Sequence, residues 1–87
     1  PFEDDESRVY PVSISIKAVN RYHFLIDVVN KISNELHLSI DSLNTVTNDE
    51  IVDMTVVFYV HSVNELLSAM QSIYTIEGID EVRETRR

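Results

Sequence analysis

The chain has 87 residues, a hydrophobic fraction of 44%, a formal net charge of −8 at pH 7 and no cysteine. A chain of this length and composition forms one domain with one core, and disorder is excluded for most of it. No apolar run reaches the roughly 18 residues of a membrane span, and the lack of cysteine excludes a disulfide framework and thiol chemistry, in agreement with the cytoplasmic location that we expect.

Residues 1–8 are the most acidic part of the chain. Four acidic side chains follow one another there: Glu3, Asp4, Asp5 and Glu6. Such a run is typical of a solvated linker, and we expect it to join residues 9–87, the folded domain, to an upstream domain. The first residue is Pro1 rather than methionine, which also favours a piece of a longer protein. The seven lysines and arginines are scattered, so independent nucleic-acid binding is disfavoured.

Residues 12–19 alternate between apolar and polar side chains, which predicts a strand with one face on the core. The apolar positions are Val12, Ile14, Ile16 and Ala18, and the polar ones are Ser13, Ser15 and Lys17. From Phe24 the apolar period becomes that of a helix of about 13 residues that ends near His37. The expected buried stripe of this helix comprises Phe24, Leu25, Val28, Val29, Ile32 and Leu36. The strand thus leads directly to a helix N-terminus, whose unpaired N–H groups bind anions and carboxylates, and this junction is the first candidate ligand site.

Residues 38–47 are rich in β-branched and small polar side chains and predict a second strand. Ile40 and Leu43 interrupt its alternation, which indicates a β-bulge or an edge position. A polar turn over residues 47–50 leads into a third strand over residues 51–60. One face of this strand is expected to carry Met54, Val56, Phe58 and Val60, and the other Thr55, Val57 and Tyr59.

Ser62 and Glu65 form a capping box, which marks the start of a second helix. The face that we expect this helix to bury comprises Leu66, Leu67, Met70, Ile73 and Tyr74. Gly78, the one glycine of the chain, lies where the chain must leave the helix and turn. Residues 79–85 predict a short last strand.

The predicted order is β-α-β-β-α-β with short connections. Both βαβ crossovers must be right-handed, which places the two helices on one face of the sheet. The first and third strands have the longest regular alternation and should be central. The fold class is therefore α+β, a ferredoxin-like βαββαβ sandwich with a four-stranded antiparallel sheet in the order 4-1-3-2.

Several function classes can be weighed on this fold. An RNA-binding domain would need aromatic side chains on the open face of the first and third strands, where the sequence offers Tyr59 among small polar residues. RNA binding therefore stays an alternative of lower rank. No metal site is expected from His23, His37 and His61, which lie far apart in the sequence without adjacent ligands. No cofactor and no catalytic residue are expected either, because the chain has no credible nucleophile–base arrangement and no glycine-rich phosphate loop.

Three segments carry a resemblance to a known family. The opening strand contains Tyr10-Pro11-Val12 followed by Ile14 and Ile16. Residues 20–25 read Asn-Arg-Tyr-His-Phe-Leu, and the later matches lie at residues 43–45, 54–55 and 76–83. In order and spacing these segments resemble the ACT domain, and within that family the C-terminal copy of RelA/SpoT-type (p)ppGpp synthetase/hydrolases, which are GTP pyrophosphokinases. The loop at residues 20–25 is similar to the family's Asp-Arg-x-Gly-Leu-Leu.

The resemblance implies that residues 9–87 are a regulatory domain without chemistry of its own, attached to upstream catalytic domains of a transferase. It also implies a homodimer, and ribosome contact of the full-length protein in the sensing of starvation. The small core and the edge position of the second strand independently favour a dimer through sheet edges or through helices. Some members bind a branched-chain amino acid. The implied ligand- or partner-binding residues are Asn20, Arg21, Tyr22, His23, Phe24 and Leu25.

Two loop positions differ from the family pattern. His23 stands where the family has glycine, and its imidazole would occupy space that a ligand needs. Asn20 stands where the family has an acidic residue, so the charge that would pair with an α-amino group is lost. From the residues alone, the role of a turn or N-cap residue is favoured for Asn20 over a contact to a ligand or partner. We therefore expect regulation by contact, with branched-chain amino-acid sensing at this loop as the alternative.

Overall fold

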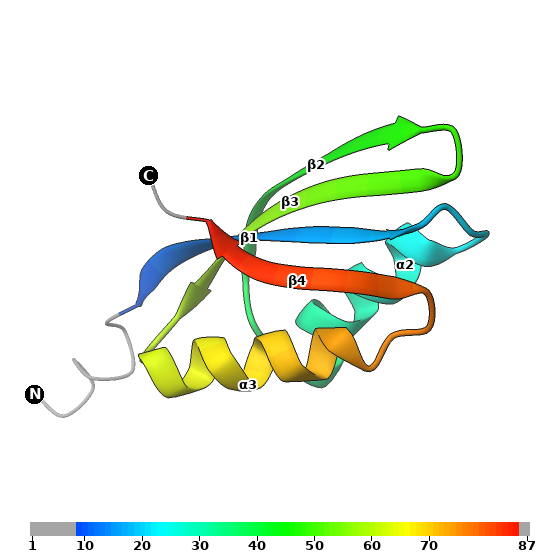
Figure 1. Ribbon diagram of the computed structural model, residues 1–87. Coiled ribbons are helices and arrows are strands. Elements are labelled where there is room, and N and C mark those ends of the chain that lie inside the picture. Colours follow the sequence, from blue (N-terminus) through cyan, green and yellow to red (C-terminus); the bar gives the residue numbers. More distant parts are fainter. Residues whose placement is uncertain (1–8, 86–87) are drawn as a thin grey trace, which may run out of the picture.

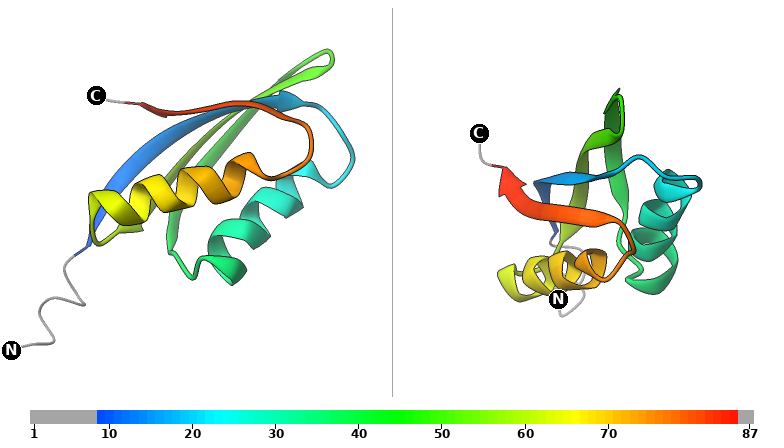
Figure 2. Two further views of the ribbon diagram at one scale, coloured as in Figure 1. Left: turned by 60° about the horizontal axis from the view of Figure 1, so that its bottom comes forward. Right: turned by 45° about the vertical axis from the view of Figure 1, so that its right-hand side comes forward.

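A computed structural model describes residues 9–85 and shows a four-stranded antiparallel sheet with strand order β2-β3-β1-β4 (Figure 1). Both helices cover the same face of this sheet (Figure 2). The predicted order 4-1-3-2 is therefore confirmed. The elements are β1 (Tyr10–Val19), α2 (Phe24–Asn30), the π-helical turn η1 (Lys31–Glu35), β2 (Ile40–Asn48), β3 (Ile51–Val60), α3 (Val63–Tyr74) and β4 (Ile79–Thr85). The predicted linker over residues 1–8 lies outside the described residues. No helix within residues 9–85 is long and apolar enough to span a membrane.

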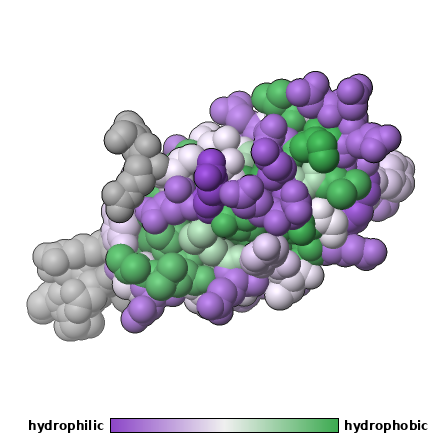
Figure 3. All heavy atoms as spheres, in the orientation of Figure 1, coloured by the Kyte–Doolittle hydropathy of each residue, from purple (hydrophilic) through white to green (hydrophobic). Residues whose placement is uncertain are grey.

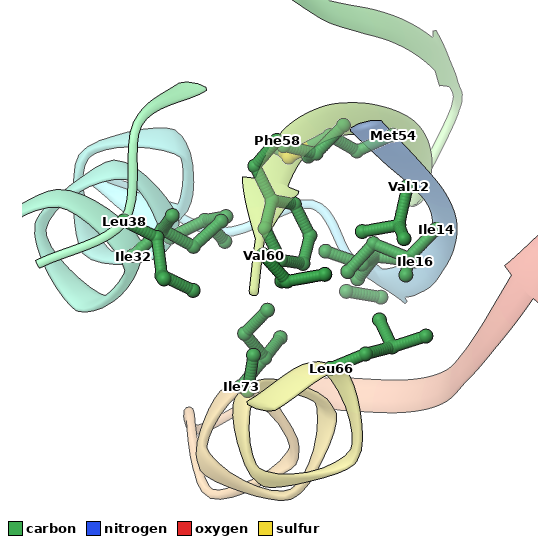
Figure 4. Packing of buried hydrophobic residues seen from close by; sticks show 14 of the residues in the cluster. Val12, Ile14, Ile16, Ile32, Leu38, Met54, Phe58, Val60, Leu66 and Ile73 are labelled. Carbon is green, nitrogen blue, oxygen red and sulfur yellow. The ribbon is translucent and has the colours of Figure 1, made fainter. Parts of the chain in front are cut away.

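The two central strands supply most of the core. β1 and β3 pair along ten residues each, from Tyr10 opposite Val60 to Val19 opposite Ile51. Because alternate side chains of a strand share a face, this register places the apolar positions of both strands under the helices. The buried strand residues are Val12, Ile14, Ile16, Ala18, Val52, Met54, Val56, Phe58 and Val60 (Figure 4). The predicted inward faces of both strands are confirmed.

The first helix has about the predicted extent but is wound differently from what the sequence predicts. It is α-helical to Asn30 and continues as a π-helical turn, in which the Leu36 backbone N–H donates to the Lys31 carbonyl 3.0 Å away. His37 ends it with φ 58°, the left-handed conformation that glycine more often supplies. Phe24, Val28 and Ile32 are buried, whereas Leu25, predicted to be buried, is 45% exposed. Successive helix residues point about 100° apart, so Leu25 cannot share the direction of Phe24.

The irregularity predicted in the second strand is confirmed. β2 lies at the edge of the sheet, and its register against β3 shifts between Ile40 and Ser42, as a β-bulge does. The bulge lies beside Asp41, whose carboxylate accepts a hydrogen bond of 3.1 Å from the Tyr59 hydroxyl. This hydrogen bond raises the pKa of Tyr59, because it stabilises the protonated phenol and places a negative charge beside it.

The start of α3 is capped as predicted, with one difference. The Ser62 hydroxyl accepts a hydrogen bond from the Glu65 backbone N–H at 3.2 Å, and the Glu65 carboxylate accepts one from the His61 backbone N–H at 2.5 Å. A standard capping box would direct this second bond to the N-cap residue itself. The bond from the His61 N–H holds the pKa of Glu65 below its ordinary value, because it favours the charged carboxylate.

The buried face of α3 was predicted only in part. Leu66, Ala69 and Ile73 enter the core, while Leu67 and Tyr74, predicted to be buried, are more than half exposed. The physical reason is again angular, because residues 66, 69 and 73 lie within about 60° of one another around the helix axis and residues 67 and 74 lie on its flank. The helix therefore has two apolar stripes, where the sequence predicts one.

Candidate functional site

Three turns that are far apart in the sequence meet at one end of the sheet, at the right of Figure 1. The β1–α2 loop is tied to the α3–β4 turn by a hydrogen bond of 2.9 Å from the Val19 N–H to the Gly78 carbonyl. It is tied to the β2–β3 turn by one of 2.8 Å from the Asn20 N–H to the Glu50 carbonyl. The loop that carries the predicted site is therefore held by the backbone on both sides.

Arg21 connects this end of the molecule through its side chain. Its Nε donates to the Glu77 carbonyl at 2.8 Å, its Nη1 to the Tyr22 carbonyl at 3.0 Å and its Nη2 to the Asp27 carboxylate at 2.6 Å. The guanidinium carbon also lies 5.7 Å from the centre of the Phe24 ring, within the range of a cation–π contact. The donors of Arg21 are thus directed at the protein, and its charge is paired with Asp27. Arg21 shapes the loop and does not offer a free cation to a ligand.

Gly78 leaves the space that the Arg21 side chain occupies. It adopts φ 96°, and a Cβ at this position would lie 3.3 Å from the Arg21 Nε. Both the backbone conformation and the space favour glycine. The predicted turn at Gly78 is confirmed, but its packing against an arginine 57 residues earlier has no local signal in the sequence.

Asn20 belongs to the turns and does not cap the helix. Its side-chain Nδ2 lies 3.5 Å from the Asp49 carbonyl, to which it donates. The N-cap position of α2 is His23, which makes no side-chain capping bond. Of the two local roles predicted for Asn20, the structure supports the turn and excludes the N-cap.

His23 keeps the backbone conformation of a glycine while carrying a side chain. Its φ is 68°, in the left-handed region that residues other than glycine rarely adopt. Its ring stacks on Tyr22, with ring centres 4.0 Å apart and 26° between the planes. Tyr22 is 85% exposed. The loop therefore presents a pair of stacked aromatic rings to the outside.

All six residues predicted for the site line one hollow of about 500 Å³ between this loop and the helix-facing side of β2 and β3. The hollow is also lined by residues that were not predicted for the site: Ile26, Thr45, Thr47, Val52 and Met54. The register places Thr45 opposite Met54 and Thr47 opposite Val52. Thr45 and Thr47 could have been assigned to this face from the predicted hairpin, because a residue opposite a buried position on the neighbouring strand shares its face. The wall is mainly apolar, with two threonines beside it.

The open face of the sheet, which the helices do not cover, is poorly suited to bind a nucleic acid. Ser13 lies opposite Val57 and Ser15 opposite Thr55. The aromatic residue of this face, Tyr59, is hydrogen-bonded to a carboxylate, and a negative charge at that place repels phosphate. Within residues 9–85, no group of three or more histidine, cysteine or acidic residues is placed to hold a metal ion.

Comparison with known proteins gives one family. The sequence model of a family described as ACT domain matches residues 6–83. No curated protein resembles the chain closely enough in sequence to count as a relative.

Solved structures share the fold at low sequence identity. The ACT domain from GTP pyrophosphokinase of Chlorobium tepidum superimposes with a TM-score of 0.80 and 15% identity, covering 90% of this chain and 100% of that one. A homoserine dehydrogenase from Thiobacillus denitrificans gives 0.71 and 17%, covering 92% of this chain and 18% of that one. The C-terminal domain of the MgtC protein from Mycobacterium tuberculosis gives 0.68 and 12%, covering 86% and 84%. At such identities these likenesses show the fold alone.

Proposed function

Because this chain belongs to the ACT domain family, we propose that it is the non-catalytic regulatory domain of a bifunctional (p)ppGpp synthetase/hydrolase. In this proposal it relays starvation signals to the catalytic domains of its own polypeptide through protein or ribosome contacts and through dimerisation. The structural likeness to the ACT domain of a GTP pyrophosphokinase extends over the whole length of that domain. It supports this choice of parent enzyme.

The observation that carries regulation by contact is the internal bonding of the β1–α2 loop. Arg21 directs its donors to the protein, and the Asn20 side chain bonds to the β2–β3 turn. What the loop turns outward is Tyr22 stacked on His23, followed by the half-exposed Leu25 and Ile26. Tyrosine is among the residues that most often anchor a protein interface, and Tyr22 is 85% exposed. The loop is therefore better built to touch a partner than to grip a charged small molecule.

The test is made in the intact protein that contains this chain. Replacing Tyr22 with alanine should weaken the response of (p)ppGpp synthesis and hydrolysis to starvation on the order of tenfold, the loss typical of an interface anchor. The matched control is Tyr10→Ala, at the opposite end of β1. An unchanged response in Tyr22→Ala, or a polypeptide without a synthetase or hydrolase domain upstream of residue 1, would contradict the proposal.

The hollow at the loop favours a second candidate function, the sensing of a free branched-chain amino acid. Its apolar wall has the chemistry that a valine, leucine or isoleucine side chain needs. The His23 ring lines the same hollow, at the position where the family has glycine.

Calorimetry with the three branched-chain amino acids at millimolar concentration separates the two functions. We expect no heat of binding from the unaltered chain. His23→Gly should keep the fold, because glycine readily adopts φ 68°, and any binding that it gains would identify the ring as the obstacle. Glycine as the titrated amino acid is the control, since it lacks the apolar side chain. Heat and a raised melting temperature with the unaltered chain would favour the sensor.

A further inference from the structure

A second hollow, of about 610 Å³, lies on the open face of the sheet. It is built around the first residues of β1 and the last residues of β3, at the end of β1 that lies away from the β1–α2 loop (Figure 1). The register sets Pro11 opposite Tyr59 and Ser13 opposite Val57, and these positions alternate with buried ones, so they belong to the face that the helices leave open. A hollow of this volume is large enough for a small ligand or for a side chain of a partner.

The hollow combines an apolar wall with acidic groups. Pro11, Val57 and the ring of Tyr59 supply the apolar part, and the charged residues that line it are Asp41 and Glu84. No lysine, arginine or histidine among residues 9–85 lines it. The Tyr59 hydroxyl donates to the Asp41 Oδ1 at 3.1 Å, and within the described part of the chain the Asp41 carboxylate makes no other hydrogen bond and no ion pair. Its second oxygen is therefore free to accept from a ligand.

The β-bulge of β2 places this carboxylate beside the ring. The register against β3 shifts between Ile40 and Ser42, so Asp41 is the extra residue of the bulge. A bulge bends its strand and changes the direction of a side chain, and bulges are frequent beside functional sites. The irregularity of the edge strand thus holds a carboxylate against an aromatic ring, at the position where the hollow lies.

The surroundings of the hollow are acidic as well. In Figure 3 hydrophilic surface covers the middle of the molecule, where β4 runs in Figure 1. The one basic residue of β4, Arg83, already lies close to a carboxylate, with 3.4 Å between its Nε and the Glu81 Oε2. The chain as a whole has a net charge of −8. Such a field raises the local concentration of cations and keeps anions away, so a positively charged partner is favoured.

We propose that this hollow binds the guanidinium group of an arginine side chain that a basic segment of a protein partner presents. A guanidinium stacks on an aromatic ring and donates hydrogen bonds to a carboxylate, and it loses its water more easily than the ammonium group of lysine. In the hollow it would stack on Tyr59 and donate to Asp41, while Pro11 and Val57 contact its methylene groups.

An arginine within a polypeptide suits the hollow better than the free amino acid. Free arginine carries a carboxylate that needs a positive group, and the described residues that line the hollow include none. The inference goes beyond the proposed function, because it names the chemistry of a contact on a different face from the β1–α2 loop and requires no particular upstream enzyme.

The experiment is a titration of the isotope-labelled 87-residue chain with the blocked peptide acetyl-Gly-Arg-Gly-amide, followed by NMR at about 0.15 M salt. The backbone amide signals of Ser13, Val57 and Tyr59 should shift, with a dissociation constant in the millimolar range. The same peptide with citrulline in place of arginine keeps the shape without the charge, and it should bind about tenfold more weakly or less. The peptide with lysine should bind with intermediate affinity.

Two variants of equal charge locate the contact. Asp41→Asn should weaken the binding of the arginine peptide about tenfold, because it removes the charge but keeps an oxygen that accepts the Tyr59 hydroxyl. Asp53→Asn is the matched control, since Asp53 lies on the same face opposite Lys17 and does not line the hollow. It lies roughly 20 Å along β3 from Tyr59, well beyond the Debye length of about 8 Å, and should leave the affinity unchanged. Circular dichroism checks the folding of both variants.

Several results would overturn the inference. They are an arginine peptide that shifts none of these signals, equal affinities for the arginine and citrulline peptides, an affinity that Asp41→Asn leaves unchanged, and tighter binding of free arginine than of the blocked peptide. Arg86 and Arg87 lie outside the described residues and follow Thr85, which lines the hollow. Binding that appears only when both are replaced with glutamine would assign the hollow to this chain's own arginines. None of these results bears on the proposed function, which is tested at Tyr22 in the intact protein.

Discussion

Replacing Arg21 with alanine should lower the free energy of unfolding by about 2 kcal/mol, the sum expected when several side-chain hydrogen bonds are lost from a partly exposed position. The arginine holds two backbone carbonyls, those of Tyr22 and Glu77, together with the Asp27 carboxylate. The ion pair with Asp27 is partly exposed and contributes the smaller share. Urea denaturation followed by circular dichroism measures the change.

Two variants show whether the effect comes from the shape of the guanidinium. Arg21→Lys keeps the positive charge but cannot reach three separate acceptors, so it should recover little of the lost stability. Lys31→Ala removes another cation, which is paired with the exposed carboxylate of Glu35 at 3.0 Å, and should cost no more than about 0.5 kcal/mol. Full recovery in Arg21→Lys, or an equal loss in Lys31→Ala, would show that charge alone matters and that Arg21 does not shape the loop.

Gly78→Ala should lower the free energy of unfolding by about 2 kcal/mol, for a different physical reason. Alanine is strained at φ 96°, and its Cβ would lie 3.3 Å from the Arg21 Nε, closer than ordinary contact. The nearby backbone cannot move freely, because the Gly78 carbonyl accepts the Val19 N–H. Thermal or urea unfolding of the single variant measures the loss.

A double-mutant cycle separates the two causes. In an Arg21→Ala background the crowding at Gly78 is relieved while the backbone strain remains, so Gly78→Ala should cost less there than in the unaltered chain. Equal costs in the two backgrounds would mean that the backbone conformation alone requires glycine. The loop of the proposed partner contact would then not depend on the packing of Arg21 against Gly78.

The sequence by itself determined the elements, their order and the family. Alternation in β1 and β3, the capping box before α3 and the single glycine are local signals, each produced by the geometry of a strand, a helix start or a turn. They were enough to predict the sheet order, because handed crossovers leave few arrangements of βαββαβ. The loop residues 20–25 were also identified in advance as one group, and the structure brings them around one hollow.

Only the tertiary structure decided what those residues do to one another. Arg21 reaches the carbonyl of Glu77, 56 residues away, and no periodicity records a hydrogen bond between distant turns. The conformation of His23 depends likewise on how the loop is held from both sides. On α3 the sequence showed that many residues are apolar, but which stripe is buried depends on the rotation of the helix over the sheet. That rotation places Leu66, Ala69 and Ile73 in the core and leaves Val63, Leu67 and Tyr74 exposed.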